Sequence, residues 1–428
     1  MGKVKKVVTI GASVFIACSL LISPAIAKHN SSHVAKNVIF MVPDGQGLSN
    51  VTAARIFKNG PDGEPLHQET LENIGYQRTH SKNGTVTDSA AAASAWAVGE
   101  KFNNNEVSCH SGEPGECIGM IPTILELAAS KGKATGLVAT SQISHATPAA
   151  FGAHVTSRYC GAEIARQYIV DSKVDVILGG GLLDTRHSGK GCDAYTESYY
   201  AVTFEDHDSD PTTPPIDNMV DSTSYITNLA LNNGYTYVFN EDGMNSAVLS
   251  GSKKVLGMFQ QAGIGKGKTP EMGFVDPDFV YPDGEPTLAE MTKAALDILE
   301  KDPDGLFLMV EGSQIDWADH ANDIEYQIAE SLAFDASVKV VLDWVNAHSA
   351  RKNKTLVIIV ADHDCGGFGV NGPGDELSEA GDIVTGEWTS GDHTAVDTIV
   401  YSQGPGSEKL NAAVDNTDLY YVMESVLH

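Results

Sequence analysis

The sequence is poor in basic residues. Its 428 residues include 28 lysines and arginines against 56 aspartates and glutamates, so the formal net charge at pH 7 is −28. A surface of this kind repels nucleic acids and anionic membranes, because both are negatively charged. We therefore expect no nucleic-acid or membrane partner, and an anion site in this chain needs its own local cations.

Cysteine is also scarce, with six in the chain. No pair has the spacing of a thiolate zinc site, which excludes structural zinc of that kind. Cys109 and Cys117 bracket a polar loop with glycine and proline, and Cys160 and Cys192 flank the next predicted element. In a chain that is exported, we predict these two disulfides, in that order, with Cys365 as a free thiol.

Long apolar runs are absent after the first part of the chain, so no later segment can span a bilayer. Three lysines precede the apolar run 7–22, and small residues up to Ala27 follow it. This order is typical of a secretory signal peptide cleaved after Ala27. We predict a periplasmic or secreted protein with one domain over 28–428. A lipoprotein signal at Cys18 is the alternative, although the residues before it form a poor lipobox.

Continuous apolar runs predict buried strands, and helical patterns lie between them. The strands are expected at 37–42, 134–140, 174–178, 306–310 and 356–361, and the helices at 121–130, 288–299 and about 323–348. Thr287 and Glu290 form a capping box for the second helix, and Asn322 is the expected cap of the third. This alternation indicates an α/β fold with a mostly parallel central sheet and helices on both faces. Loop insertions are expected at about 186–221 and 366–391.

Polar side chains follow several of these strands directly. They are Asp44, His145, Thr147, Glu311, Asp362 and His363. In a parallel sheet the ligand site lies beyond the carboxyl ends of the strands, so we expect these groups to converge.

Three further candidate metal ligands follow Glu311 in the sequence. Asp316 and His320 are four residues apart and share one face if a helical turn begins there. His393 follows a glycine-rich loop and precedes another apolar strand. Taken alone, each of these has a simpler reading as a capping, solvated or surface residue. Together with Asp362 and its neighbours they fill two sites of nitrogen and oxygen ligands, which zinc prefers.

The segment 87–99 places one hydroxyl at the head of a run of strong helix formers. Ser89 has the position of an N-cap or first-turn residue, and Gly99 ends the segment. Free N–H groups and the helix dipole favour an anion at that end, so a phosphate fits there. The alternative is that Asp88 and Ser89 only cap a buried helix.

Seven motifs, in this order, resemble those of the alkaline phosphatase family over nearly all of the chain after residue 27. They are Met41–Gly45, Thr87–Ala91, Ile143–Ala149, Ala153–Arg158, Glu311–Asp316, Ala361–His363 and Gly391–Thr394. The resemblance implies hydrolysis of phosphate monoesters through a phosphoserine intermediate, with two Zn²⁺ and one Mg²⁺ as cofactors. It also implies a homodimer.

The same resemblance implies a role for each site residue. Ser89 is the nucleophile, and Arg158 binds the phosphate. The metal ligands form three groups: Asp316, His320 and His393 for one zinc; Asp44, Asp362 and His363, beside Ser89, for a second; and Asp44, Thr147 and Glu311 for a third, magnesium-type site.

Two positions depart from the best-known bacterial pattern. His145 stands where an aspartate is often found near the third metal, and Trp317 where a lysine is often found near the phosphate. Imidazole suits zinc better than magnesium, which leaves the identity of the third ion open. Loss of the lysine ammonium is expected to weaken phosphate retention and to speed product release.

Rival functions remain open on the sequence. A phosphodiesterase of the same superfamily is expected to lack the third metal's ligands and the arginine, and a sulfatase needs a Cys-x-Pro-x-Arg type context that is absent. A non-catalytic phosphate- or metal-binding protein is expected to have lost Ser89 or a zinc ligand.

Overall fold

The computed structural model describes Gly2 and residues 34–112, 116–181, 226–259, 284–372, 377–382 and 384–427. Contacts divide the chain into two units, Met1–Ser31 and Ser32–His428, and the fold below is that of the second. The predicted signal peptide, the insertion at 186–221 and Cys192 lie outside the described residues. In the described part of the chain, no helix has both the length and the apolar character that crossing a bilayer requires.

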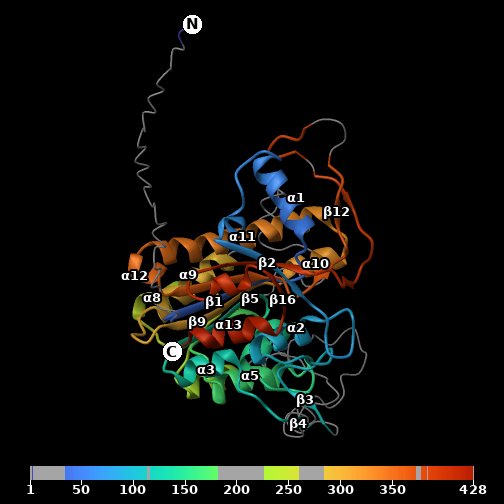
Figure 1. The fold of residues 1–428 in the computed structure, drawn as a ribbon. Coiled ribbons are helices and arrows are strands. Elements are labelled where there is room, and N and C mark those ends of the chain that lie inside the picture. Colours follow the sequence, from blue (N-terminus) through green and yellow to red (C-terminus); the bar gives the residue numbers. More distant parts are fainter. Residues whose placement is uncertain are drawn as a thin grey trace. The chain divides into compact units, whose positions relative to one another are not determined.

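A sheet of ten described strands forms the centre of this unit (Figure 1). Across the sheet, the strands are β16 (Ala413–Asp415), β2 (Asn73–Arg78), β15 (Thr398–Gln403), β10 (Thr355–Val360), β1 (Asn37–Pro43), β9 (Leu306–Gly312), β5 (Ala134–Gln142), β6 (Val176–Gly180), β8 (Val255–Phe259) and β7 (Thr236–Val238). Neighbouring strands are parallel except in the two pairs that include β15. The predicted mostly parallel sheet is confirmed.

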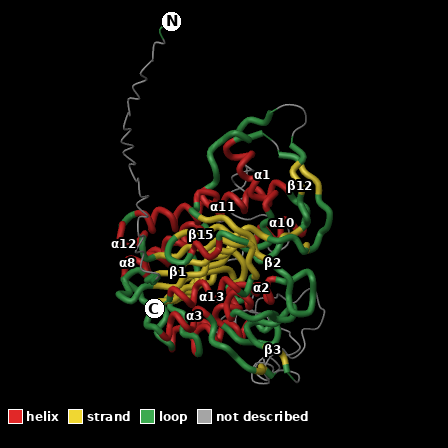
Figure 2. The backbone as a smooth tube through the Cα atoms, viewed as in Figure 1, coloured by secondary structure: helices red, strands yellow, loops and turns green. Residues whose placement is uncertain are grey.

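Helices cover both faces of this sheet (Figure 2). One face carries α2 (Ser89–Val98), α3 (Ile124–Ser130), α4 (Ala146–Gly152), α5 (Gly161–Val170) and α13 (Asp418–Val426), and the other carries α8 (Glu241–Ser250), α9 (Leu288–Leu299) and α11 (Ile324–Asn346). In β1, Phe40 and Val42 join the first apolar layer, whereas Ile39 and Met41 join the second. A strand with apolar neighbours on both faces needs the continuous apolar run seen in the sequence.

Short elements complete the unit. They are α1 (Leu48–Asn59), α10 (Gln314–His320), α12 (Ser349–Lys352), the 3₁₀ turns η1 (His67–Thr70) and η3 (Ser407–Leu410), and the two-stranded pairs β3 (His110–Ser111) with β4 (Cys117–Ile118), β11 (Asp364–Cys365) with β14 (His393–Thr394), and β12 (Gly369–Val370) with β13 (Gly386–Glu387). The predicted insertion at 366–391 therefore contains short strands, and Phe368 and Val384 pack it against α1 and α11.

Helix starts follow capping chemistry. The predicted helix 288–299 is present as α9, with the expected capping box of Thr287 and Glu290. The prediction that Asn322 caps the long helix is wrong. Asp323 is the cap and accepts a hydrogen bond from Tyr326 N at 3.1 Å. Asn322 instead has a φ of 52°, a left-handed conformation that asparagine tolerates.

The helix predicted over 121–130 begins three residues later, at Ile124. Thr123 caps it and forms a capping box with Glu126, which ends the preceding loop at this point.

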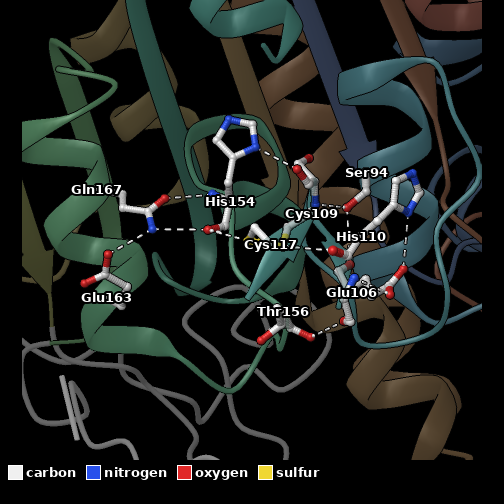
Figure 3. The surroundings of a disulfide bond; sticks show 11 residues. Ser94, Glu106, Cys109, His110, Cys117, His154, Thr156, Glu163 and Gln167 are labelled. Atoms are coloured by element: carbon white, nitrogen blue, oxygen red, sulfur yellow. Dashed lines mark hydrogen bonds and ion pairs between the residues drawn. A yellow bond between two sulfur atoms is a disulfide. The ribbon is translucent and has the colours of Figure 1, made fainter. Parts of the chain in front are cut away.

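A disulfide joins Cys109 and Cys117, the first predicted pair, and closes the β3–β4 hairpin (Figure 3). Cys160 is also disulfide-bonded. Its predicted partner lies outside the described residues. Cys365 is free and buried, as expected.

Candidate active site

Three carboxylates lie at the carboxyl ends of neighbouring strands, at the same edge of the sheet. In the β1–β9 pair, Val42 lies opposite Glu311, and Asp44 N donates to Gly312 O at 3.2 Å. On the other side of β1, Gly45 N donates to Asp362 Oδ1 at 3.1 Å. The side chains of Asp44, Glu311 and Asp362 are all 0% exposed. The parallel register thus brings together carboxylates from distant parts of the chain, with Asp44 and Asp362 318 residues apart.

Ser89 is the first residue of α2. Asp88 caps this helix by accepting a hydrogen bond from Ala91 N at 2.9 Å, and Gly99 ends it in the left-handed conformation. Every residue of α2 is buried, and its alanines allow the helix to pack closely against its neighbours. The helix start therefore lies at the strand ends, where Ser89 Oγ is 3.2 Å from His363 Nε2.

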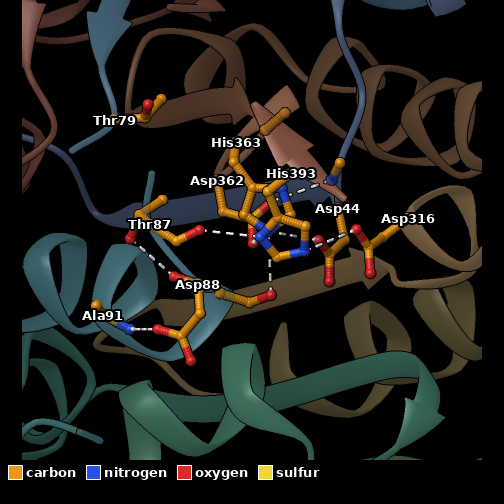
Figure 4. A network of polar contacts seen from close by, with 12 residues as sticks. Asp44, Thr79, Thr87, Asp88, Ala91, Asp316, Asp362, His363 and His393 are labelled. Carbon is orange, nitrogen blue, oxygen red and sulfur yellow. Dashed lines mark hydrogen bonds and ion pairs between the residues drawn. The ribbon is translucent and has the colours of Figure 1, made fainter. Parts of the chain in front are cut away.

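Asp316, His320 and His393 converge as one group, which we call the first group. Figure 4 shows His393 and Asp316 facing each other. His393 Nε2 lies 3.4 Å from Asp316 Oδ1, His320 Nε2 lies 3.5 Å from Asp316 Oδ2, and the two Nε2 atoms are 3.1 Å apart. The other ring nitrogens face backbone carbonyls, with His320 Nδ1 2.7 Å from Gly391 O and His393 Nδ1 2.9 Å from Thr87 O. Metal-binding histidines are commonly oriented in this way.

Asp44, Asp362 and His363 form a second group next to the first. His363 Nε2 lies 3.0 Å from Asp362 Oδ2 and 3.6 Å from Asp44 Oδ1. The ring of His363 stacks on that of His393, with centroids 3.5 Å apart. Ligand atoms of Asp44, Asp316 and His363 lie within 4.8 Å of one another, so the two groups share a border.

A third group contains Asp44, Glu311 and His145, which offer ligand atoms within 4.8 Å of one another. Thr147 lies two residues after His145, in the first turn of α4. Asp44 is thus common to the second and third groups.

The two carboxylates of the third group, Asp44 and Glu311, are poorly compensated within the described chain. Burial, and then the charges of Asp362 and its neighbours, raise the pKa of Asp44 well above its usual value. Burial raises the pKa of Glu311 to about 8. Both carboxylate oxygens of Asp44 and of Glu311 are buried without a hydrogen-bond partner among the described residues. Such groups are costly to bury unless cations bind them, so the donor set fits metal ions.

The first group behaves differently, because its histidines offset the carboxylate. Burial raises the pKa of Asp316, but the contact with His393 and the charges of the histidines outweigh it and lower the value. Burial lowers the pKa of His393, but Asp316 raises it to about 9. Burial also raises the pKa of Asp362, yet the charge and hydrogen bond of His363 lower it to about 2.

Arg158 reaches this region from the segment after α4. Its Nη1 donates to Asp88 Oδ2 at 2.9 Å, and its Nη2 lies 3.2 Å from His145 Nε2. Burial and the Arg158 charge lower the pKa of His145 to about 3, so the imidazole is neutral. Burial opposes the Arg158 charge, but Asp88 outweighs it and raises the arginine pKa. Trp317 is half-buried on α10, with its ring 6.2 Å from that of His145 in an edge-to-face arrangement.

Gly45 sits where two backbones meet. Its φ is +75°, and a Cβ added there would lie 2.8 Å from Asp316 Cα. No other residue type fits this turn without displacing α10.

The structure brings together Ser89, Arg158, Trp317 and the nine other predicted metal-ligand residues. Two residues at the site were missed by the sequence reasoning. The sequence predicts Asp88 only as a cap, although its position directly before Ser89 within a motif indicates a further role, here the contact with Arg158. Cys365 had no assigned role, although it lies two residues after His363.

The sequence is similar to known phosphatases. The family model for alkaline phosphatase matches residues 35–381. Alkaline phosphatase 4 of Bacillus subtilis is 31% identical over 477 residues, covering 94% of this chain and 91% of that protein. The alkaline phosphatase of Escherichia coli is 31% identical over 449 residues, covering 93% and 87%.

Solved structures show the same relationship. The alkaline phosphatase from the Antarctic bacterium TAB5 has a TM-score of 0.65 and 26% identity, covering 92% of this chain and 98% of that chain. The same scores hold for a histidine-to-aspartate mutant of that enzyme, which has magnesium bound. With carboxylates at its strand ends, a buried serine and these relatives, the chain belongs to the alkaline phosphatase family, whose function is the hydrolysis of phosphate monoesters.

Proposed function

We propose that this protein hydrolyses small phosphate monoesters at the site around Ser89, with Ser89 as the nucleophile. One observation carries the proposal. Ser89 Oγ lies at the N-terminus of α2, 3.2 Å from His363 Nε2, where the second group and Arg158 also converge. A hydroxyl in this position is near metal ligands and near groups that attract an anion.

The proposed reaction has two displacements at phosphorus. Ser89 Oγ forms a bond to phosphorus while the ester P–O bond breaks, and the alcohol leaves. Water then attacks the phosphoserine, which releases inorganic phosphate and restores the hydroxyl. Arg158 binds two phosphate oxygens through its planar guanidinium, and the free N–H groups of α2 face the same anion.

We infer two zinc ions and one magnesium ion as the cofactors. The first group would hold one zinc, the second group with Ser89 the other, and Asp44, Thr147 and Glu311 the magnesium. When bound, such ions lower the pKa of a coordinated hydroxyl and stabilise the charge on the leaving oxygen. The unpartnered oxygens of Asp44 and Glu311 support this assignment.

His145 is a weak candidate for the third site in its present orientation. A neutral imidazole has one N–H and one lone pair. While His145 Nε2 accepts the Arg158 Nη2 hydrogen bond, the ring carries its proton on Nδ1 and has no lone pair for an ion. We infer that His145 orients Arg158 and that oxygen ligands hold the third ion.

Trp317 is proposed to set the lifetime of the product complex. It brings an indole to the phosphate side of the site. An indole is uncharged and cannot form an ion pair with the phosphate dianion. Weaker phosphate retention is the expected result.

We also propose that the protein is exported and acts as a homodimer. The disulfide between Cys109 and Cys117 supports export, because such bonds persist in oxidising compartments. The dimer rests on the family resemblance.

The decisive experiment compares hydrolysis of a chromogenic phosphate monoester with that of the matching diester, before and after chelation. We expect monoester activity that chelation removes and that Ser89→Ala lowers by at least about a thousandfold. Ser94→Ala is the matched control, because Ser94 is a buried serine on the same helix. Among the described residues, its hydroxyl bonds only the backbone groups Glu106 O and Ser108 N. This variant should keep its activity.

Other results would change the conclusion. Equal rates on both esters would indicate a phosphodiesterase. Tight binding of phosphate without turnover would indicate a non-catalytic binding protein.

A further inference from the structure

A buried free thiol lies inside the first group. Cys365 is 0% exposed, and its Sγ lies within 4.8 Å of a ligand atom on each of Asp316, His320 and His393. The other described cysteines are in disulfides. A sulfur donor is therefore present at this centre, beside the nitrogen and oxygen donors.

The backbone fixes the direction of the Cys365 Cα–Cβ bond. In the β11–β14 pair, Cys365 lies directly opposite His393. Side chains opposite each other in an antiparallel pair lie on the same face of the two strands. Cys365 N also donates to Gly45 O at 3.0 Å, and Gly366 N donates to Asp392 O, directly before β14, at 3.0 Å. The Cα–Cβ bond cannot turn away from the His393 side without breaking these backbone bonds.

Unsatisfied polar atoms face the same point. Asp316 is only 5% exposed, and its Oδ1 is buried with no hydrogen-bond partner among the described residues. Both histidines direct Nδ1 at carbonyls, which leaves two Nε2 atoms 3.1 Å apart and facing inward. One oxygen, two nitrogens and one sulfur thus surround a common centre.

We propose that Cys365 is a thiolate ligand of the zinc ion held by Asp316, His320 and His393. The inference rests on the proposed metal-dependent function. Zinc binds cysteine sulfur, histidine nitrogen and aspartate oxygen, and it can expand from four to five ligands, which leaves room for substrate. On binding, the thiol gives its proton to solvent and the sulfur lone pair forms the zinc bond, so one additional proton is released per zinc. A thiolate also selects against magnesium and calcium at this centre.

Cobalt(II) substitution tests the proposal, because a cobalt–thiolate bond gives a charge-transfer absorption in the near ultraviolet. We expect this band in the cobalt-loaded full-length protein and its loss in Cys365→Ser. The double variant Cys109→Ser/Cys117→Ser is the matched control, since it removes two other cysteines and should keep the band. Zinc affinity, measured by competition with a chelating dye, should fall at least about tenfold in Cys365→Ser.

X-ray absorption of the zinc-loaded wild-type protein gives a second measurement that needs no variant. We expect a sulfur neighbour at about 2.3 Å from zinc. If cobalt and zinc bind and monoesters are hydrolysed, but neither sulfur signal is present, Cys365 is not a ligand and the proposed function still stands. If neither metal binds, both proposals fail.

Discussion

Asp88 shows how one side chain serves two elements at the site. One carboxylate oxygen caps α2 directly before Ser89, and the other accepts the Arg158 Nη1 hydrogen bond at 2.9 Å. Arg158 therefore has a fixed orientation before any anion binds. A held side chain loses less conformational entropy on binding, which favours recognition of phosphate.

Trp317→Lys should strengthen inhibition by inorganic phosphate. The substitution introduces an ammonium group on α10, near the ring of His145 and the Arg158 guanidinium beyond it. An added charge–charge contact of about 1–2 kcal/mol corresponds to roughly a tenfold lower inhibition constant. Product inhibition measured on the monoester gives this constant. Trp317→Gln, which is polar but uncharged, is the control, and unchanged inhibition in Trp317→Lys would refute the role proposed for this residue.

His145→Asp should tighten magnesium binding at the third site. Carboxylate oxygen suits magnesium, whereas the imidazole is occupied by Arg158. The measurement is magnesium activation of the zinc-loaded enzyme, and His145→Asn is the control without charge. A magnesium requirement equal to that of wild type would contradict the prediction.

Capping residues decide where the helices begin. The start of α9 could be predicted, because Thr287 and Glu290 form a complete capping box in the sequence. The start of α11 could not, because Asn322 and Asp323 are both good caps and the choice depends on the backbone between α10 and α11. There Asn322 takes the left-handed conformation and leaves Asp323 to cap.

The start of α3 carries a half-buried ion pair that should respond to pH. Glu126 Oε2 lies 3.0 Å from His154 Nε2, and Glu126 Oε1 accepts a hydrogen bond from Ser172 Oγ at 3.0 Å. Burial raises the pKa of Glu126, but the hydrogen bond and charge of His154 outweigh it and lower the value. Burial lowers the pKa of His154, but Glu126 raises it.

The two shifts define the pH window in which this pair stabilises the protein. The lowered pKa of Glu126 contributes stability above about pH 4.3, which is lost as the pH falls through the folded value. The raised pKa of His154 contributes stability below about pH 6.5, which is lost as the pH rises through the folded value. We therefore expect the largest effect between these pH values.

Glu126→Gln tests this expectation, because glutamine can still form the capping box with Thr123. In the window the free energy of unfolding should fall by about 1–3 kcal/mol, with a smaller loss at higher pH. Denaturant unfolding at several pH values measures the difference. A loss that is the same at every pH would show that the charge is unimportant.

At the scale of the whole molecule, metal removal should destabilise the fold. Asp44, Glu311 and Asp362 lie at the ends of three neighbouring central strands, where burial raises the pKa of the first two. Ions that bind only the folded state add about 4 kcal/mol at a free concentration of a thousand times Kd. Thermal unfolding with and without chelator should show a clear fall in Tm that added zinc reverses.

A variant distinguishes the loss of Tm caused by metal removal from any destabilisation that the chelator causes by itself. Asp44→Asn/Glu311→Gln removes two buried charges, so its Tm should respond much less to chelation. An equal Tm for the metal-free and metal-loaded wild-type protein would contradict the prediction.

The central strands and their ligands were predictable from the sequence, because buried parallel strands are continuous apolar runs and Asp44, Glu311 and Asp362 follow them directly. Other strands were not. β8 (Val255–Phe259) is interrupted by Gly257, and β2 (Asn73–Arg78) has exposed residues such as Ile74. The reversed direction of β15 depends on its distant partners β10 and β2, which local pattern does not encode.

The main chains of Gly45 and Asp316 nearly touch, so the separation between Asp44 and Asp316 is set by backbone packing and not by rotamers. The distance between the two proposed zinc positions is therefore set by the packing of β1 against α10. Substitution of a ligand should vacate one position and leave the geometry of the other intact. Only a change that moves β1 relative to α10, such as Gly45→Ala, should alter that distance.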